Sequence, residues 1–254
     1  MNVINTYFMV KALPGATNMG LAATTASEAA QQRSHRQQEY IECILRNTSR
    51  SVVEVAKVVR RAHLLVQDDG SMKHLRSVVL PQVEVKAALM PVRFSRAPEQ
   101  PLYKDLFLHA NRLCSGQLCM VCNADIYLRQ DFPIDDVQRC LEADPNKVFA
   151  LTRYENEAMF GPLIDDYRGS HDAFVFKAPL KQDFVDAVDH KQNCYQSENI
   201  VIHELKRAGY DVRNPCKSCH IFHRHEAEFR QWYPSVDEQR YAKAEPCTLE
   251  ECFD

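Results

Sequence analysis

Short apolar runs alternate with amphipathic segments along most of this chain, and this alternation constrains the fold more than any other feature. Strands are expected at residues 3–8, 62–66, 83–89, 118–122, 147–152 and 173–176, and helices at residues 34–46, 102–113, 135–143 and 197–208. The run at residues 118–122 is apolar throughout, which is typical of a strand covered on both faces. Strands and helices alternating at this spacing predict an α/β fold with a mainly parallel central sheet and helices on both faces.

At 254 residues the chain has the length of one large α/β domain, and no internal repeat divides it. The formal net charge of −3 argues against an electrostatic grip on nucleic acid. No apolar run reaches the roughly 20 residues that cross a bilayer, and residues 1–9 lack the basic leader of a signal peptide. We therefore expect a soluble protein, cytoplasmic by default; a secretory-pathway lumen stays open if an anchor has been removed.

The ten cysteines are scattered, and several lie inside apolar runs. This pattern favours free buried thiols, which behave as small hydrophobic side chains, over a disulfide framework. Cys216 and Cys219 stand at C-x₂-C spacing and histidines follow them, as in a structural zinc site. No second C-x₂-C pair supports that alternative, and four ligands so close in sequence would make a cramped site.

The pattern best placed for chemistry is Asn123-Ala124-Asp125, which directly follows the run at residues 118–122. Ligands of a parallel sheet gather at the carboxyl ends of its strands. Residues two apart on an extended chain point the same way, so the Asn123 amide and the Asp125 carboxylate could face one cation. Mg²⁺ and Mn²⁺ take such oxygen ligands together with phosphate oxygens. A plain turn at the strand end explains the same residues without a ligand.

Several short stretches resemble, in order and spacing, glycosyltransferases of the GT-A fold, in the nucleotide-diphospho-sugar transferase-like group. The matching stretches are residues 4–8, 36–40, 63–66, 103–107, 123–127, 150–155, 169–174, 197–199, 208–210 and 223–225. The resemblance implies a single GT-A-like domain and a metal-dependent transfer of sugar from a nucleoside-diphosphate sugar to a carbohydrate, lipid or protein hydroxyl. Residues 1–120 would form its nucleotide-binding half, residues 121–230 its acceptor and catalytic half, and residues 231–254 a peripheral tail.

The same resemblance places Asn123-Ala124-Asp125 at the family's DxD metal motif, with Mn²⁺ or Mg²⁺ as the ion. Asparagine replaces the first acid here, so Asp125 alone supplies charge. The metal would then bind more weakly than usual, or only together with the donor. A late histidine often completes the metal or diphosphate shell in similar transferases, which implies His223 or His225 as a further ligand. Ordinary packed or exposed histidines are the competing interpretation.

Three more positions are assigned to the donor nucleotide. Thr6 lies in the first matching stretch, and the resemblance gives Asp68, at the end of the second expected strand, a role in holding the nucleoside. An Asp-Asp-Gly turn explains Asp68 equally well. Arg93 lies in the loop expected after residues 83–89, where its guanidinium fork would match phosphate oxygens or simply face solvent.

Two acids compete for the role of general base. Asp172 follows a polar turn and enters a strand, and Glu198 lies in the first turn of the helix expected at 197–208. Either carboxylate would have to reach an acceptor hydroxyl within hydrogen-bond distance. Turn closure by Asp172 and a favourable helix dipole at Glu198 are the structural alternatives. The sequence leaves inversion and retention both open.

Two other functions compete with a transferase. A nucleotidyltransferase or sugar-nucleotide pyrophosphorylase would be expected to carry a Gly-rich, basic loop after the first strand, and Lys11 and Gly15 supply only part of one. A non-catalytic nucleotide-sugar-binding protein of the same fold is the second alternative, favoured by Asn123. Residues 15–32, rich in small and polar side chains, are expected to form a mobile loop that closes over the donor.

Overall fold

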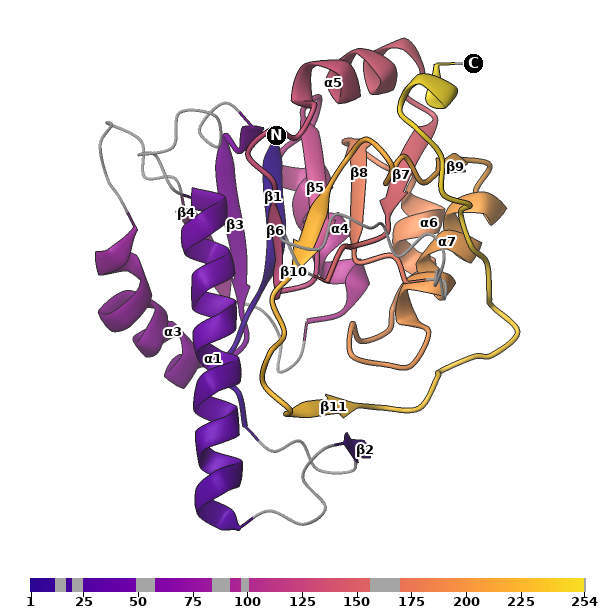
Figure 1. Cartoon of the computed structure of the whole chain (residues 1–254). Coiled ribbons are helices and arrows are strands. Elements are labelled where there is room, and N and C mark those ends of the chain that lie inside the picture. The colour runs from indigo at the N-terminus through magenta and orange to yellow at the C-terminus, as the bar shows by residue number, and fades with distance from the viewer. Residues whose placement is uncertain are drawn as a thin grey trace.

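The computed structural model describes residues 1–11, 17–19, 25–48, 58–83, 92–96, 101–155 and 170–253. Its centre is a seven-stranded sheet (Figure 1). In order across the sheet, the strands are β4 (Val92–Arg96), β3 (Arg61–Val66), β1 (Asn2–Tyr7), β5 (Leu118–Cys122), β8 (Ala173–Lys177), β7 (Lys147–Leu151) and β9 (Asp211–Arg213).

Most neighbours in this sheet run parallel. β1 pairs in parallel with β3 and β5, β3 with β4, and β7 with β9. Only β8, among the described strands of this sheet, runs against both of its neighbours, with Val121 opposite Phe174. The prediction of a mainly parallel α/β sheet is therefore confirmed.

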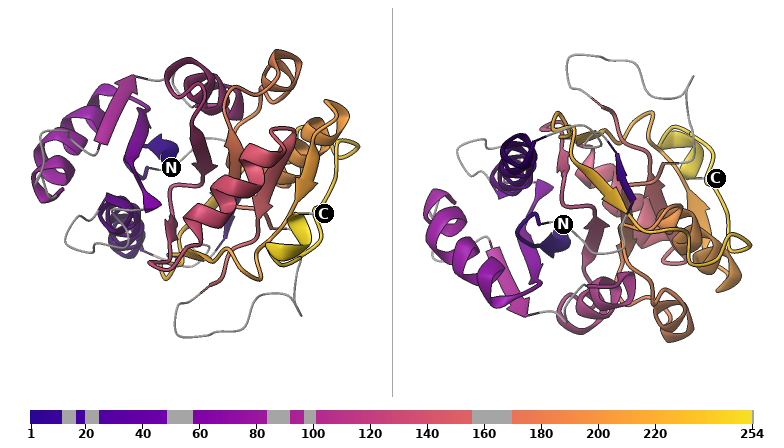
Figure 2. Two further views of the ribbon diagram at one scale, coloured as in Figure 1. Left: turned by 90° about the horizontal axis from the view of Figure 1, so that it is seen from above. Right: turned by 90° about the horizontal axis from the view of Figure 1, so that it is seen from below.

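Helices cover both faces of the sheet, as Figure 2 shows from above and below. The described helices are α1 (Ala26–Thr48), α3 (Asp69–His74), α4 (Tyr103–Leu113), α5 (Ile134–Ala143), α6 (Gln182–Ala187) and α7 (Ser197–Arg207). A π-helical turn at Leu75–Val79 and a 3₁₀ turn at Leu80–Gln82 follow α3. Another 3₁₀ turn lies near the C-terminus at Glu250–Cys252.

The central strands send alternate side chains into two apolar layers. In β5, Cys119 and Val121 pack in the layer that contains Phe107 of α4, whereas Met120 and Cys122 pack in the opposite layer with α5. This double coverage explains why the strand carries no polar residue. The segment 231–254 contributes to both layers through the buried side chains of Ala244, Leu249 and Cys252. The division into two halves and a tail remains a prediction.

Two small antiparallel sheets lie beside the carboxyl edge of the main sheet. β10 (Ile221–His223) pairs with β6 (Ile126–Leu128), so that His223 lies opposite Ile126, immediately after Asp125. β11 (Arg230–Trp232) pairs with β2 (Thr17–Met19) at the lower edge of Figure 1. The β10–β6 pair therefore brings a late histidine close to Asp125, three residues after β5 ends.

The structure corrects two local expectations. The first helix begins at Ala26 rather than near residue 34, because Thr25 and Glu28 cap it reciprocally through their side chains and backbone N–H groups. Residues 26–32 of the expected loop are thus helical, and residues 17–19 form β2.

Two further expectations concern the region around β4. The strand expected at 83–89 lies outside the described residues except for Val83, which is in a bend. Arg93 lies within β4 and not in a loop, with its backbone opposite His63. The Arg93 side chain is outside the described part of the chain, so its assignment to phosphate remains a prediction.

All ten cysteines carry free thiols, as expected, and nine of them are buried. Within the described residues, no helix is both long enough and apolar enough to span a membrane.

Candidate active site

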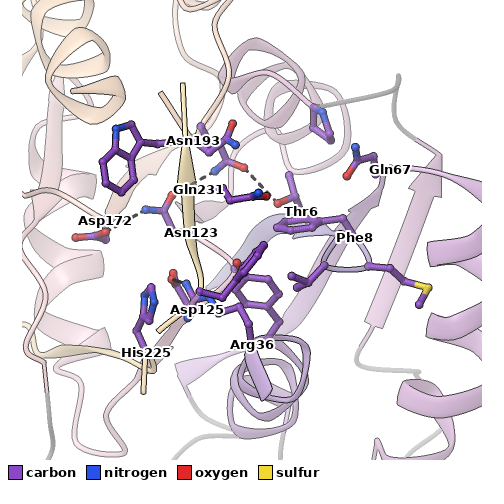
Figure 3. A pocket seen from close by; sticks show the side chains of 18 of the residues that line it. Thr6, Phe8, Arg36, Gln67, Asn123, Asp125, Asp172, Asn193, His225 and Gln231 are labelled. Carbon is purple, nitrogen blue, oxygen red and sulfur yellow. Dashed lines mark hydrogen bonds and ion pairs between the residues drawn. The ribbon is translucent and has the colours of Figure 1, made fainter. Parts of the chain in front are cut away.

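A cleft of about 300 Å³ opens where β1, β3 and β5 end (Figure 3). Its polar wall contains the expected motif, and its other walls are aromatic or amide-bearing. The lining residues used below are Thr6, Phe8, Arg36, Tyr40, Asn123, Asp125, Arg153, Asp172, Gln192, His223, His225, Phe229 and Trp232. The volume lies at the lower end of the range typical of small-molecule sites.

Asp125 is the central acid of the polar wall and is only 9% exposed. Its Oδ2 accepts hydrogen bonds from Arg36 Nη2 and, at 3.0 Å, from His223 Nε2. Burial alone would raise the pKa of this carboxyl, but the neighbouring His223 and Arg36 outweigh it and hold the pKa well below its usual range. Asp125 is therefore ionised at neutral pH.

His223 lies between two carboxylates. Its Nδ1 is 2.9 Å from Glu155 Oε2, and its Nε2 meets Asp125. Burial would lower the pKa of the imidazole, but Asp125 and Glu155 together raise it. In the imidazolium form both ring N–H groups donate to carboxylates, which fixes the ring orientation.

Asp125, His223 and His225 form the one group of described Asp, Glu, His and Cys side chains whose ligand atoms all lie within 4.8 Å of one another. One carboxylate oxygen and two imidazole nitrogens make a donor set suited to a divalent transition metal. Glu155 behind His223 matches the carboxylate that often orients a metal-binding imidazole. The family resemblance implied these three residues as metal ligands, and the structure brings their side chains together. The C-x₂-C pair at Cys216 and Cys219 belongs to no such group.

Asn123 hydrogen-bonds to different residues from Asp125, although only Ala124 separates the two in the sequence. Its Nδ2 donates to Asp172 Oδ1 at 3.0 Å and to Glu198 Oε1 at 3.1 Å. Its Oδ1 accepts from Gln192 Nε2 at 3.5 Å, and Gln192 Oε1 in turn accepts from Thr6. Asn123 therefore links the two candidate bases to the end of β1, as the dashed contacts in Figure 3 show in part.

The two candidate bases have different environments. Asp172 is buried. Arg153 Nη1 donates hydrogen bonds to both of its carboxylate oxygens at 2.7 Å, and Ser170 Oγ donates a further one. Glu198 is half-buried and has no arginine partner among the contacts described. Burial and the nearby Asp172 charge raise the pKa of Glu198 to about 7. Glu198 can therefore exchange a proton near neutral pH, whereas an ion pair engages Asp172.

The raised pKa of Glu198 predicts a pH-dependent effect of Glu198→Gln. An acid whose pKa is higher in the folded state takes up a proton on folding, so wild-type stability falls as pH rises from 4.5 towards 7. Glutamine is neutral and does not titrate, so the variant does not lose stability in this way as pH rises. We expect the variant to be about 1–3 kcal/mol more stable than wild type at pH 8 and equally stable near pH 4, measured by urea unfolding. Glu142→Gln is the matched control, because Glu142 is an exposed residue of α5. Its free energy of unfolding should change by no more than about 0.5 kcal/mol at both pH values. A Glu198→Gln difference independent of pH would contradict this prediction.

Aromatic side chains also line the cleft. The rings of Phe8 and Tyr40 meet edge to face, with 5.1 Å between centroids. The Arg36 guanidinium lies 4.6 Å from the Tyr40 ring centre. Phe229, directly before β11, and Trp232, at the end of β11, line the cleft as well. Such a surface suits a flat ring or the apolar face of a sugar.

The donor residues expected from sequence take different places. Thr6 and Ala124 line the cleft, and their contact with the donor remains a prediction. Asp68 instead caps α3, accepting from Ser71 N at 2.7 Å, and pairs with Lys11 Nζ at 2.9 Å. The Ser71 backbone and Lys11 bonds lower the pKa of Asp68 to about 2. Its turn role is thus present, and its contact with a nucleoside remains a prediction.

Sequence reasoning assigned no site role to Arg36, Arg153 or Glu155. Arg36 pairs with Glu39, three positions on, at 2.7 Å, and it also reaches Asp125. Arg153 and Glu155 follow β7, whose carboxyl end meets the same edge of the sheet. That position after a buried strand is the signal that could have identified them.

Comparison with known proteins gives limited information. No family model matches the chain, and no curated protein matches it in sequence. One similar solved structure is described as GalNAc-T7 with UDP, GalNAc and Mn²⁺, with a TM-score of 0.46 and 11% sequence identity. The match covers 98% of this chain and 47% of the other, so this chain spans about half its length.

Proposed function

We propose that this chain is a metal-assisted glycosyltransferase of GT-A type, which moves a sugar from a nucleoside-diphosphate sugar to a hydroxyl acceptor. The observation that carries the proposal is the meeting of Asp125, His223 and His225 inside a cleft at the carboxyl ends of parallel strands. Ligand sites of α/β sheets form at this edge. The aromatic side chains that line the same cleft would supply a surface for the donor's base or sugar.

The donor set favours Mn²⁺ over Mg²⁺. Two imidazoles and one carboxylate suit a transition ion, whereas Mg²⁺ prefers oxygen ligands throughout. A bound divalent ion would neutralise charge on the departing diphosphate. Asp125 would supply the anionic ligand, and Arg36 would keep that carboxylate ionised and correctly turned. Glu155 would orient His223 through Nδ1.

The acid pair would act on the acceptor. Glu198, with a pKa of about 7, can accept a proton from a hydroxyl near neutral pH. The side-chain amide nitrogen of Asn123 donates to both Glu198 and Asp172. These two hydrogen bonds would therefore set the distance between the two carboxylates. Arg153 holds Asp172 in an ion pair, which leaves Glu198 as the acid without an arginine partner among the contacts described. This assigns Glu198 as base and Asp172 as its positioning partner.

Nucleotide binding tests the proposal without knowledge of the acceptor. We expect UDP or GDP to bind at least tenfold more tightly with Mn²⁺ present, measured by calorimetry on wild type and His225→Ala. A ligand at 100 times its dissociation constant should also raise the free energy of unfolding by about 2.7 kcal/mol. His225→Ala should retain the fold and lose the Mn²⁺ dependence.

Release of UDP or GDP from the corresponding nucleotide sugar then tests catalysis. Mn²⁺-dependent release is expected in wild type and not in His225→Ala. No binding of any nucleoside diphosphate, with or without Mn²⁺, would refute the proposal. Mn²⁺-dependent binding without release would favour a non-catalytic nucleotide-sugar-binding protein. Formation of a nucleotide sugar from a nucleoside triphosphate and a sugar phosphate would instead identify a nucleotidyltransferase.

A further inference from the structure

The C-terminal segment 242–253 runs along the β7 and β9 side of the sheet (Figure 1). Cys247 N donates to Asn214 O at 2.8 Å, and Cys247 O accepts from Lys217 N at 3.2 Å. Ala244 O accepts from Asn214 Nδ2 at 3.1 Å, and the same backbone group contacts His171 Nε2 at 3.2 Å. The segment is therefore fixed on both sides of Cys247.

Two thiols meet within this segment. The Sγ atoms of Cys247 and Cys252 are 3.6 Å apart. Thr248 and Glu251 bond reciprocally, and the turn at Glu250–Cys252 folds the chain back. A disulfide bond is about 2.05 Å long, so closing the gap takes roughly 1.5 Å of sulfur movement. Side-chain rotation with a small backbone shift supplies a movement of that size.

The two thiols differ in access and in acidity. Cys247 is partly exposed, whereas Cys252 is fully buried. The hydrogen bond from Cys252 lowers the pKa of the Cys247 thiol to about 7, and the same contact raises the pKa of Cys252. Exchange reactions start from an accessible thiolate, and a neighbouring thiol then resolves the mixed disulfide. Cys247 fits the first role and Cys252 the second.

The other nearby thiols lack this arrangement. Cys140 is buried and its Sγ contacts Cys252 O at 3.3 Å. Burial raises the pKa of the Cys216 thiol to about 12 and that of the Cys219 thiol well above its usual value. Protonated buried thiols are poor nucleophiles. The reactive pair is thus distinct from the C-x₂-C motif.

We propose that Cys247 and Cys252 form a reversible thiol–disulfide exchange site that reacts with low-molecular-weight disulfides of the glutathione type. The Cys247 thiolate attacks one sulfur of the oxidant, forming a mixed disulfide and releasing one thiolate. Cys252, losing its proton to solvent, attacks Cys247 Sγ and releases the second thiolate. The protein loses two hydrogens and the oxidant becomes two thiols, so atoms and electrons balance. This inference does not depend on the glycosyltransferase proposal.

The site is joined to the candidate active site through described contacts. Asn214 binds the Thr152 backbone N–H at 3.1 Å and its hydroxyl at 2.9 Å. Thr152 precedes Arg153, which holds Asp172. Oxidation would therefore close a covalent loop in the segment that supports this end of β7.

Thiol counting on the full chain with glutathione disulfide tests the proposal. Denatured wild type should fall from ten titratable thiols to eight, with a mass about 2 Da lower and one linked peptide joining Cys247 to Cys252. Cys252→Ser should stop at a glutathione adduct on Cys247, and Cys247→Ser should react at least tenfold more slowly. Cys140→Ser is the matched control and should still form the bond.

Each outcome decides the proposal. Ten thiols remaining after excess oxidant would overturn it, as would a linkage that involves Cys216 or Cys219. An adduct on Cys252 in the Cys247→Ser variant at the wild-type rate would refute the assigned order of attack. Dithiothreitol should restore all ten thiols, and failure to do so would refute reversibility.

Discussion

Asp125→Asn is expected to destabilise the protein by about 3 kcal/mol, the lower end of the cost of breaking a buried ion pair. Asparagine keeps the shape of the side chain but leaves the buried Arg36 guanidinium opposite a neutral group. Glu39 Oε2 still accepts from Arg36 Nη1 at 2.7 Å, which limits the loss. Urea unfolding at pH 7 measures the change as a shift in midpoint with an unchanged slope.

Two further variants separate charge from shape. Arg36→Met combined with Asp125→Asn removes both charges of this pair but also leaves the buried Glu39 carboxylate without its arginine, so the double variant should be less stable than Asp125→Asn alone. Asp131→Asn is the matched control, because Asp131 pairs with Arg129 at 2.8 Å but its side chain is 62% exposed. It should change stability by less than about 1 kcal/mol. Equal stability of Asp125→Asn and wild type would show that the Arg36 pair contributes nothing.

The location of the site could be predicted from the sequence because it depends on one strand. The residues at 118–122 are apolar on both faces, so the strand had to be central, and Asn123-Ala124-Asp125 had to lie at its carboxyl end. The structure places these residues in the cleft. His223 and His225 were expected as ligands from the family resemblance, and they do meet Asp125.

The partners of these residues could not be predicted, because they come from distant parts of the chain. Arg36 and Asp125 are 89 positions apart, and Glu155 and His223 are 68 apart. Arg36 has a sufficient local explanation in Glu39, three positions on, so its helix pattern gives no sign of a second acid. Only the packing of α1 against β6 brings it to the motif.

The direction of β8 also escaped prediction for a physical reason. Ala173–Lys177 is buried on both faces like its neighbours, and an apolar run of this kind is compatible with either direction. Arg93 was misplaced because residues 83–89 resemble a strand, whereas the edge strand is Val92–Arg96. Local β propensity identifies a strand but not its pairing partner.

His225→Ala is expected to lower the affinity for Mn²⁺ by about 100-fold or more. Loss of a supporting residue already costs 10–100-fold, and His225 would be a direct ligand. The side chain is partly exposed, so the free energy of unfolding should change by less than about 1 kcal/mol. Titration of free Mn²⁺ by electron paramagnetic resonance measures the affinity. His203→Ala, a partly exposed histidine on α7, is the matched control and should bind Mn²⁺ like wild type.

Glu155→Gln and pH distinguish a metal site from a histidine pair. Glutamine retains a hydrogen bond to His223 Nδ1 but removes the charge, so Mn²⁺ affinity should fall 10–100-fold. Because the pKa of His223 is raised, Mn²⁺ must displace its proton, and affinity should increase with pH through the range in which that imidazole titrates. Calorimetry in two buffers of different ionisation enthalpy should show proton release on Mn²⁺ binding. Wild-type Mn²⁺ affinity in both His225→Ala and Glu155→Gln would place the metal elsewhere, and the Asp125–His223 contact would then be a buried ion pair without a ligand role.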